Sequence, residues 1–297
     1  MKLFKGSGVA IVTPFKEGKV DFGKLTDLIR WHVEEGTDAL VVAGTTGESA
    51  TLSREEKLEV FRHAMKVAEG KIQVIAGTGS NNTAESISLS VEAEMCGVDG
   101  LLLVTPYYNK PSQRGLYAHY KAVADSVSIP VILYNVPGRT SVDLRPETVI
   151  ELSRVPNILG LKEASGDVAR IRPLVQALPD DFMVYAGNDG EIVDVLESGG
   201  HGVISVLANI VPGAVHQMTE AYFKGNIEQA RKSQAEYSTL IGALFSDTNP
   251  VPVKAAMNLM GWKVGGVRLP LVEMEEDSLR KLEVVLKDYG LTGDENR

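Results

Sequence analysis

The stretch ILGLK (residues 158–162) decides the fold, because its apolar part has the length and composition of a buried β-strand. Similar apolar runs recur along the chain, at residues 9–12, 39–42, 72–76, 100–104, 131–134, 182–186 and 202–206. Short apolar strands that alternate with amphipathic helices predict parallel βαβ units. Eight such units fit a closed (β/α)8 TIM barrel of the α/β class better than an open doubly wound sheet.

Helix signals separate these strands. Asp21 is a favourable N-cap, and Ser53 followed by Glu56 is a capping-box pattern. From about residue 227 the strand signals stop and helical patterns remain, one over residues 227–244 and another over residues 279–289. We therefore expect a catalytic barrel over residues 1–225 and a C-terminal helical extension over residues 226–297.

Composition limits the class of protein. A length of 297 residues suits one α/β barrel with an addition, since such barrels often span about 200–250 residues. A net charge of −9 argues against binding to a nucleic-acid backbone, which needs a basic face. The single cysteine favours a reducing compartment, and the sequence has neither a signal-peptide pattern nor a run long enough to span a membrane. We expect a soluble cytoplasmic protein that binds neither nucleic acid nor membrane.

Lys162 is the candidate reactive group. An ammonium at the end of a buried strand loses hydration, which should lower its pKa below the usual value of about 10.4. Only the neutral amine attacks a carbonyl carbon to form a Schiff base. Considered alone, a lysine at an exposed strand end with its ammonium in water is the more ordinary interpretation.

The other conspicuous polar residues also follow predicted strands. Active sites of such barrels lie at the carboxyl ends of the strands, so we expect these side chains to converge with Lys162. A guanidinium there is suited to a bidentate grip on a carboxylate, whereas the threonines could be turn residues and a strand tyrosine could belong to the core. The residues are Thr45, Thr46, Tyr107, Tyr108, Tyr134 and Arg139.

Other chemistries find less support. Glu48 and Glu163 could form a glycosidase pair, but Glu163 follows Lys162 and should therefore point to the opposite face of the strand. The histidines lack metal-site spacing, and a structural role is the better interpretation of His201. Cys96 is expected at a helix end as a packed residue.

Several motifs together resemble those of a known family. They are GTTGES (44–49), VTPYYNKPS (104–112), YNVPGRT (134–140), GLKEASGD (160–167), GND (187–189), GGHGVISV (199–206), TNPVPVKAAMN (248–258) and RLPLV (268–272). With these motifs the chain resembles the dihydrodipicolinate (4-hydroxy-tetrahydrodipicolinate) synthase family, which belongs with N-acetylneuraminate lyase to the pyruvate-dependent class I aldolases. The resemblance covers nearly the whole chain.

The resemblance implies a lyase that condenses pyruvate with L-aspartate 4-semialdehyde to 4-hydroxy-tetrahydrodipicolinate, in lysine and diaminopimelate biosynthesis. Lys162 would form the Schiff base, and Tyr134 would move protons with Thr45 and with Tyr108 of a neighbouring subunit. The protonated imine is itself the electron sink, so no metal or organic cofactor is implied. The implied substrate-binding residues are Thr46, the main chain of Ile204, Gly187 and Arg139.

The resemblance also implies an assembly and an effector pocket. The family usually forms a homotetramer, a dimer of dimers. Lys57 stands where lysine-inhibited relatives commonly have histidine, and with nearby Arg54 it should oppose a cationic effector, so we expect weak or absent feedback by L-lysine. Ser141 also departs from the glycine of many relatives. The matching pocket residues are Ser49, Ala50, Lys57, Asn81, Glu85 and Tyr107.

Two alternatives remain open at this point. The same lysine and tyrosine would serve an N-acetylneuraminate or 2-keto-3-deoxy-sugar-acid aldolase, although Arg139 favours a second substrate with a carboxylate. A non-catalytic barrel used as a scaffold would not need Lys162, Tyr134 and Thr45 together.

Overall fold

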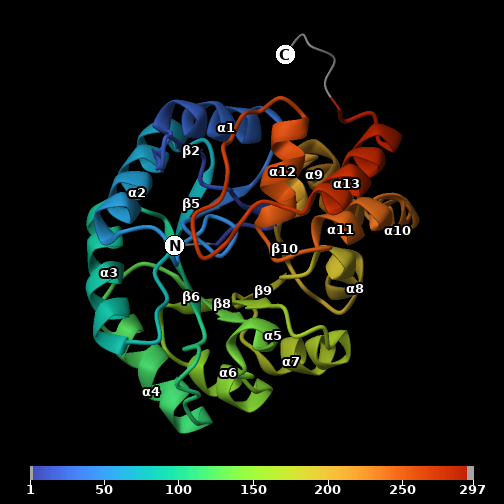
Figure 1. Cartoon of the computed structure of the whole chain (residues 1–297). Helices are drawn as coiled ribbons and strands as arrows, with labels where there is room; N and C mark the ends of the chain where they lie inside the picture. The colour runs from blue at the N-terminus through green and yellow to red at the C-terminus, as the bar shows by residue number, and fades with distance from the viewer. Residues whose placement is uncertain (1–2, 293–297) are drawn as a thin grey trace.

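The computed structural model describes residues 3–292, and within them eight parallel strands close into a barrel that helices surround (Figure 1). The expected (β/α)8 architecture is therefore confirmed. In chain order the barrel strands are β1 (Gly6–Ala10), β4 (Ala39–Val42), β5 (Gln73–Gly77), β6 (Gly100–Val104), β7 (Val131–Asn135), β8 (Ile158–Glu163), β9 (Met183–Ala186) and β10 (Gly202–Ser205). Two short strands, β2 (Phe15–Lys16) and β3 (Lys19–Val20), form a separate antiparallel pair.

The first barrel strand begins earlier than predicted. We expected it at residues 9–12, where the first apolar run lies. The Ser7 main chain instead donates a hydrogen bond to Asp38 Oδ2 at 2.8 Å, and Gly6 pairs with Gly202 to close the barrel. A Cβ on Gly202 would collide with the main chain of Gly6, so the closure depends on a residue without a side chain.

The barrel helices follow the local signals. Asp21 caps α1 by accepting a hydrogen bond from the Lys24 main chain, and Ser53 and Glu56 form the expected capping box at α2. The helices are α1 (Phe22–Glu34), α2 (Arg54–Ala68), α3 (Thr83–Met95), α4 (Gln113–Ala124), α5 (Pro137–Thr140), α6 (Pro146–Leu152), α7 (Ile171–Ala177), α8 (Ile192–Glu197) and α9 (Pro212–Phe223). Short 3-10 turns are η1 (Val168–Arg170), η2 (Asp189–Glu191) and η3 (Leu207–Asn209).

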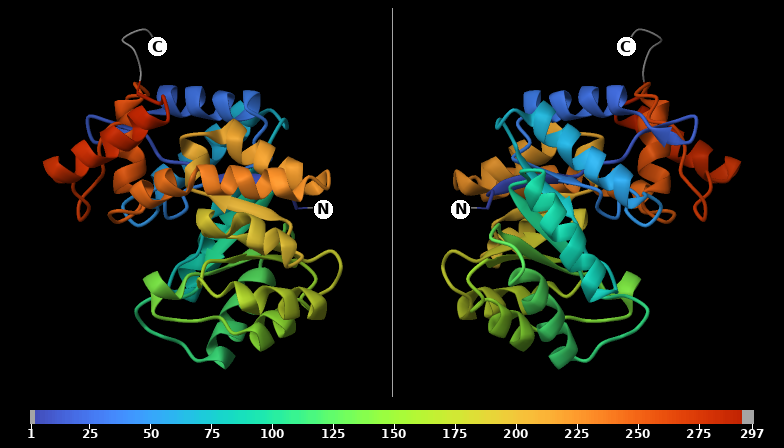
Figure 2. Two further views of the ribbon diagram at one scale, coloured as in Figure 1. Left: turned by 90° about the vertical axis from the view of Figure 1, so that its right-hand side faces the viewer. Right: turned by 90° about the vertical axis from the view of Figure 1, so that its left-hand side faces the viewer.

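Four further helices form the C-terminal part, orange to red at one side of the barrel (Figures 1 and 2). They are α10 (Ile227–Glu236), α11 (Ser238–Leu244), α12 (Val251–Leu259) and α13 (Glu276–Asp288). The single pattern expected over residues 227–244 is thus two helices. They separate at Tyr237, whose ring stacks on Tyr289 with the ring centroids 5.7 Å apart.

The apolar core has two parts, and their division orients the site. One cluster fills the space between strands and helices and includes Leu133 and Leu161. The other lies inside the barrel and includes Ile132 and Tyr134. Alternation along a strand therefore points Tyr134 inward from β7, and Lys162, beside Leu161, inward from β8. No helix among residues 3–292 has the length and apolar character needed to cross a membrane.

Candidate active site

Lys162 and Tyr134 face each other at the carboxyl ends of β8 and β7. The strands pair with Tyr134 opposite Lys162, and the lysine Nζ lies 4.4 Å from the centroid of the tyrosine ring. Both side chains are nearly inaccessible to solvent, at 5% exposed for Lys162 and 6% for Tyr134. The structure therefore places the amine inside the barrel mouth and not in bulk water.

Burial sets the protonation of this lysine. The pKa of Lys162 is lowered to about 8, mainly by loss of hydration and to a smaller extent by the positive charge of Arg139. The negative charge of Asp189 acts in the opposite direction and raises the pKa. An amine with this pKa is partly neutral near pH 7 to 8, so it can attack a carbonyl carbon without an external base.

Tyr134 is held as a protonated phenol. Burial raises its pKa, while Arg139 and a side-chain interaction with Thr45 oppose this rise. A protonated phenol beside a neutral amine can donate a proton to a leaving hydroxyl group and later take one back.

Asn249 joins the C-terminal helices to this site. Its Nδ2 donates to the Thr46 hydroxyl at 3.0 Å, and its main-chain oxygen accepts from Arg139 Nη2 at 3.2 Å. Neither the strand pattern nor the polar residues at strand ends indicated Asn249, although it lies in the motif TNPVPVKAAMN that carries the family resemblance. The residue therefore fixes both a threonine and the guanidinium from 110 or more positions away in the chain.

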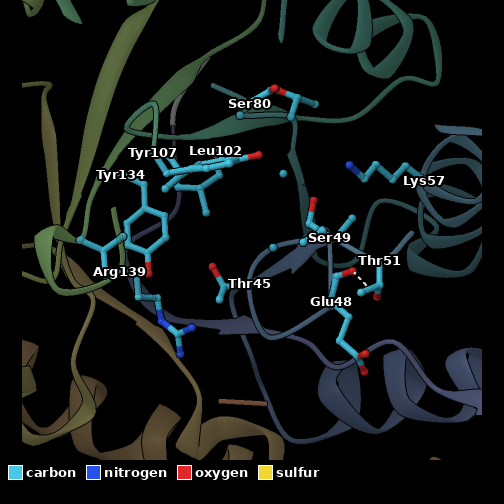
Figure 3. Close-up of a pocket in the computed structure, with 18 of the residues that line it drawn as sticks. Thr45, Glu48, Ser49, Thr51, Lys57, Ser80, Leu102, Tyr107, Tyr134 and Arg139 are labelled. Atoms are coloured by element: carbon cyan, nitrogen blue, oxygen red, sulfur yellow. Dashed lines mark hydrogen bonds between the residues drawn. The ribbon is translucent and has the colours of Figure 1, made fainter. Parts of the chain in front are cut away.

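Two cavities meet at these residues. A small chamber of about 60 Å³ is lined by Lys162, Tyr134, Thr45, Thr46 and Arg139, with Gly187 and Asn249 among its other walls. Since one water needs about 10–15 Å³, the chamber suits a ligand of only a few heavy atoms. A larger cavity of about 640 Å³ shares Tyr134, Thr45 and Arg139 with it. Figure 3 shows these three side chains grouped on one side of the larger cavity, with Lys57 on the other.

Gly187 is a glycine for steric reasons. Its main chain donates to the Glu163 oxygen at 2.7 Å, and a Cβ there would lie 2.6 Å from the Ala164 Cβ. The close approach shapes the wall of the small chamber. Ile204 lies inside the barrel on β10 as part of the inner apolar cluster, and it is not among the residues that line either of the two cavities.

Tyr108 lies apart from this group. Its side chain is 88% exposed and its backbone has φ = +73°, on the loop after β6. It lines neither cavity of this chain, whereas Tyr107 lines the larger one. The structure therefore does not bring Tyr108 to the lysine of its own subunit.

The residues expected to form an effector pocket lie in or beside the larger cavity. Five of the six line it, namely Ser49, Ala50, Lys57, Glu85 and Tyr107. The sixth, Asn81, donates from Nδ2 to the main-chain oxygen of Tyr107 at 3.2 Å. Burial lowers the pKa of Lys57, Glu85 raises it and Arg54 lowers it.

The two glutamates considered as a glycosidase pair have other partners. Glu48 accepts from Lys254 Nζ at 2.7 Å and is buried, so its charge is already neutralised. Glu163 is the last residue of β8, and its side chain points out of the barrel, where it accepts from the Asn135 side chain. The two carboxylates therefore do not share a cavity.

Three other sequence interpretations can be compared with the structure. His201 Nδ1 accepts from the Val184 main chain at 3.1 Å, a structural contact. Cys96 caps the end of α3, and burial raises the pKa of its thiol, which disfavours the reactive thiolate. Ser141 has φ = +57° at the end of α5, a conformation that glycine adopts more readily.

Asp189 is a second residue that the strand pattern did not indicate. It is buried and accepts from the Ser205 hydroxyl at 2.5 Å and from the main chains of Val206 and Leu207 at 3.0 and 2.9 Å. It thereby fixes the turn after β10 and supplies the negative charge that acts on Lys162. Its position in the motif GND was the available signal.

Comparisons with known proteins agree on one family. The model of the Dihydrodipicolinate synthetase family matches residues 3–289. A 4-hydroxy-tetrahydrodipicolinate synthase of Thermoanaerobacter sp. (strain X514) is 52% identical over the full length of both chains. A chloride-inhibited dihydrodipicolinate synthase of Acinetobacter baumannii, solved with pyruvate, superposes with a TM-score of 0.94 at 46% identity, over 97% of this chain and 99% of that one. A relative from Cyanidioschyzon merolae, solved with lysine bound, has a TM-score of 0.95 at 41% identity, over 98% of this chain and 100% of that one.

Proposed function

The chain belongs to the dihydrodipicolinate synthetase family, and on that premise we propose that Lys162, Tyr134 and Thr45 carry out its reaction. That reaction is the condensation of pyruvate with L-aspartate 4-semialdehyde to 4-hydroxy-tetrahydrodipicolinate, a step of lysine and diaminopimelate biosynthesis. The chain is thus a lyase of the class I aldolase type. The observation that carries the residue assignment is the buried Lys162 amine, 4.4 Å from the centroid of the Tyr134 ring.

The first half of the reaction makes an enamine. The neutral Lys162 Nζ attacks the ketone carbon of pyruvate, and Tyr134 donates a proton so that the hydroxyl of the carbinolamine leaves as water. The protonated imine then withdraws electrons from the adjacent methyl group. Loss of a methyl proton gives the enamine, a carbon nucleophile bound to the enzyme.

The second half joins the aldehyde and frees the enzyme. The enamine carbon attacks the aldehyde carbon of the semialdehyde, whose oxygen takes up a proton. The amine of the same substrate then attacks the imine carbon and displaces Lys162, which closes the ring. Tyr134 and Thr45 carry protons in these steps, and Lys162 returns to its amine form.

The remaining side chains bind the substrates. Thr46 holds pyruvate in the small chamber, where Gly187 leaves room for it. A contact from the main chain of Ile204 rests on the family resemblance alone. Arg139 grips the carboxylate of the semialdehyde at the entrance to the chamber. One of its nitrogens is engaged by Asn249 at 3.2 Å, which orients the guanidinium and leaves other donors for a bidentate contact.

Tyr108 completes the site from a neighbouring subunit, within a homotetramer built as a dimer of dimers. Support comes from an aromatic side chain that is 88% exposed on a loop whose neighbour, Tyr107, lines the larger cavity. A mixture of inactive K162A and Tyr108→Phe proteins should regain activity if subunits exchange, because one hybrid site then has both residues. A monomer with full turnover would overturn this shared site.

The larger cavity contains a pocket at which we expect weak or absent feedback by L-lysine. Lys57 adds positive charge there, and like charge opposes a cationic effector. Steady-state assays with added L-lysine test this expectation, and inhibition at sub-millimolar concentration would contradict it.

Two further proposals come from the sequence. One is a cytoplasmic location. The other is a division into a barrel over residues 1–225 and a helical extension over residues 226–297, of which residues 1–2 and 293–297 lie outside the described part of the chain.

The assignment of Lys162 is tested by trapping. Pyruvate and borohydride should add one reduced pyruvate per chain, located on Lys162 by peptide mass spectrometry, and Lys162→Ala should give none. An assay with aspartate semialdehyde then follows on the same protein. A trapped adduct without condensation, together with cleavage of a sugar acid, would indicate another aldolase of the same class.

A further inference from the structure

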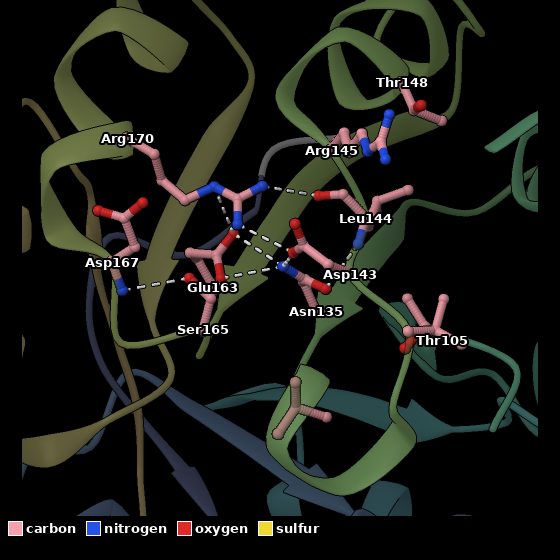
Figure 4. Close-up of polar contacts among 12 residues, drawn as sticks. Thr105, Asn135, Asp143, Leu144, Arg145, Thr148, Glu163, Ser165, Asp167 and Arg170 are labelled. Carbon is pink, nitrogen blue, oxygen red and sulfur yellow. Dashed lines mark hydrogen bonds and ion pairs between the residues drawn. The ribbon is translucent and has the colours of Figure 1, made fainter. Parts of the chain in front are cut away.

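A polar cluster lies directly behind the proposed catalytic pair. Asn135 follows Tyr134 at the end of β7, and Glu163 follows Lys162 at the end of β8. Successive side chains of a strand point to opposite faces, so these two project outward from the barrel. Figure 4 shows them meeting Asp143 and Arg170 between the two strands and the helices outside.

Hydrogen bonds in this cluster link the ends of β7 and β8. Asn135 Nδ2 donates to both oxygens of Glu163, at 3.1 and 3.2 Å, and to Asp143 Oδ1 at 2.8 Å. The Ser165 main chain donates to Glu163 Oε1 at 2.7 Å, and Arg170 Nε lies 3.9 Å from Oε2. Glu163 therefore contacts β7 through Asn135, the turn after β8 through Ser165, and the guanidinium of Arg170.

The same strand pair contains an irregularity at its other end. Val131 pairs with Ile158, but Ile132 pairs with Gly160, so Leu159 is an extra residue in β8. A slip of one residue beyond this point would turn Lys162 outward and bring Glu163 into the small chamber. A side-chain contact between Asn135 and Glu163 opposes that slip, because it exists only in the observed register.

Stability alone does not call for a carboxylate at this position. Leu133 and Leu161 lie two positions before Asn135 and Glu163 on the same outward face, and they are completely buried, so apolar residues suit this layer. Glu163 is only 4% exposed, and burial raises its pKa while Arg170, Ser165 and Asn135 lower it. Burying a charge in this way costs free energy that apolar packing would not.

We propose that Glu163 is a positioning residue for the reaction: its contacts with Asn135 and Ser165 fix the end of β8 against β7 and so hold the Lys162 amine against the Tyr134 ring. The inference rests on the proposed roles of Lys162 and Tyr134. The positive charge of Arg170 opposes the rise that burial causes in the pKa of Glu163, and Asp143 Oδ1 accepts a hydrogen bond of 2.9 Å from Arg170 Nη1.

Glu163→Gln is the sharpest variant, because it keeps the size of the side chain and replaces one acceptor oxygen with a donor. Asn135 Nδ2 then loses one of its two acceptor atoms on residue 163. A misplacement of about 1 Å can cost about 100-fold in rate, so we expect a 10- to 100-fold loss in the rate of imine trapping and in kcat. The loosened strand end should also admit water to Lys162, which raises its pKa and moves the acid limb of the pH profile to higher pH.

Asp143→Asn is the matched control. Asp143 contacts the same Asn135 and Arg170, but its side chain is 44% exposed and it lies on a loop and not on a barrel strand. The loss of such an exposed contact should change the rate by no more than about fivefold. Thermal denaturation and active-site counting by trapping correct both variants for any loss of folded protein.

The outcomes separate this inference from the proposed function. If the wild type forms no adduct on Lys162, the proposed function fails. If the wild type forms it and Glu163→Gln forms it equally fast, or if Asp143→Asn loses as much rate, the positioning role fails. Should Glu163→Gln not fold, Asn135→Ser removes the same contact from the other strand, and trapping by that variant at the wild-type rate would likewise overturn the proposal.

Discussion

At the scale of the residue, the pKa of Lys162 determines how the rate depends on pH. Below pH 8 the amine is increasingly protonated and cannot attack pyruvate, so kcat/KM for pyruvate should fall tenfold per pH unit and level off above about pH 9. The free enzyme governs this ratio, so the midpoint should lie near pH 8. Initial rates across this range measure it, and a midpoint near 10 would show that the amine is hydrated.

Arg139 should move that midpoint. Its positive charge lowers the pKa of Lys162, so Arg139→Gln should raise the pKa and shift the acid limb to higher pH. Imine trapping with pyruvate alone measures the shift without the second substrate, which Arg139 is proposed to bind. Arg114→Gln, an exposed charge on α4, controls for net charge and should leave the limb in place.

Tyr134→Phe keeps the ring against Lys162 and removes the hydroxyl that is proposed to move protons. General acid–base groups contribute about 10²- to 10⁴-fold, so kcat should fall by that amount while the adduct still forms slowly. Tyr185→Phe is the control, because the Tyr185 hydroxyl is also buried in the barrel but donates to the Phe4 oxygen at 2.7 Å. Equal effects of the two changes would show that only packing is lost.

At the scale of the element, the loop over residues 44–49 is fixed by a buried ion pair from α12. Lys254 is 1% exposed and donates to Glu48 at 2.7 Å and to the Thr13 oxygen at 3.0 Å. Lys254→Met leaves the Glu48 carboxylate buried without its cation, so we expect a loss of about 3–5 kcal/mol in the free energy of unfolding. Urea denaturation measures it.

Lys24→Met provides the comparison for that change. Lys24 forms an ion pair of 3.0 Å with Asp27, whose side chain is 54% exposed, and such surface pairs contribute about 0–1 kcal/mol. If the two variants unfold at the same urea concentration, the buried pair does not stabilise the loop.

Local sequence was a good guide to most elements and a poor one where tertiary contacts decide. Ser53 and Glu56 correctly predicted the start of α2, because a capping box depends only on residues that are neighbours in the chain. Gly6 and Ser7 were excluded from β1, because their strand conformation depends on Asp38 and Gly202. The break at Tyr237 coincides with stacking on Tyr289, which a helical pattern does not reveal.

At the scale of the whole molecule, buried histidines should make the fold sensitive to acid. Burial lowers the pKa of His32 to about 3 and of His119 to about 4, from the usual 6.5. The unfolded chain therefore takes up protons first, and stability should fall as pH drops below 6.5 until these folded-state pKa values are reached, by at most about 1.4 kcal/mol per pH unit for each histidine.

His32→Gln tests this dependence. Urea denaturation at several values between pH 7 and 4 should show a shallower loss of stability in the variant than in the wild type, because one of the two buried groups no longer titrates. Parallel pH dependence in the two proteins would show that His32 is not the source.

Only some residues of the candidate site could be predicted from the sequence. Lys162 and Tyr134 lie at the carboxyl ends of strands and Thr45 follows one, so the rule that barrel active sites lie at this face brought them together. Asn249 and Asp189 act through contacts that no strand pattern encodes, and the Asn249 hydrogen bond to Thr46 spans 203 positions. The partner for Tyr108 remains a proposal, because a single chain does not contain it.

The anchoring of Arg139 has a consequence for redesign. The amine proposed to activate the keto acid lies on a barrel strand. The guanidinium lies on the four-residue helix α5 and donates to the main-chain oxygen of Asn249, between α11 and α12. The residue proposed to activate pyruvate and the residue proposed to bind the aldehyde substrate thus lie on different segments of the chain. Exchanging residues 137–141 and 245–250 for those suited to another aldehyde should retune acceptor preference while the enamine-forming machinery stays intact.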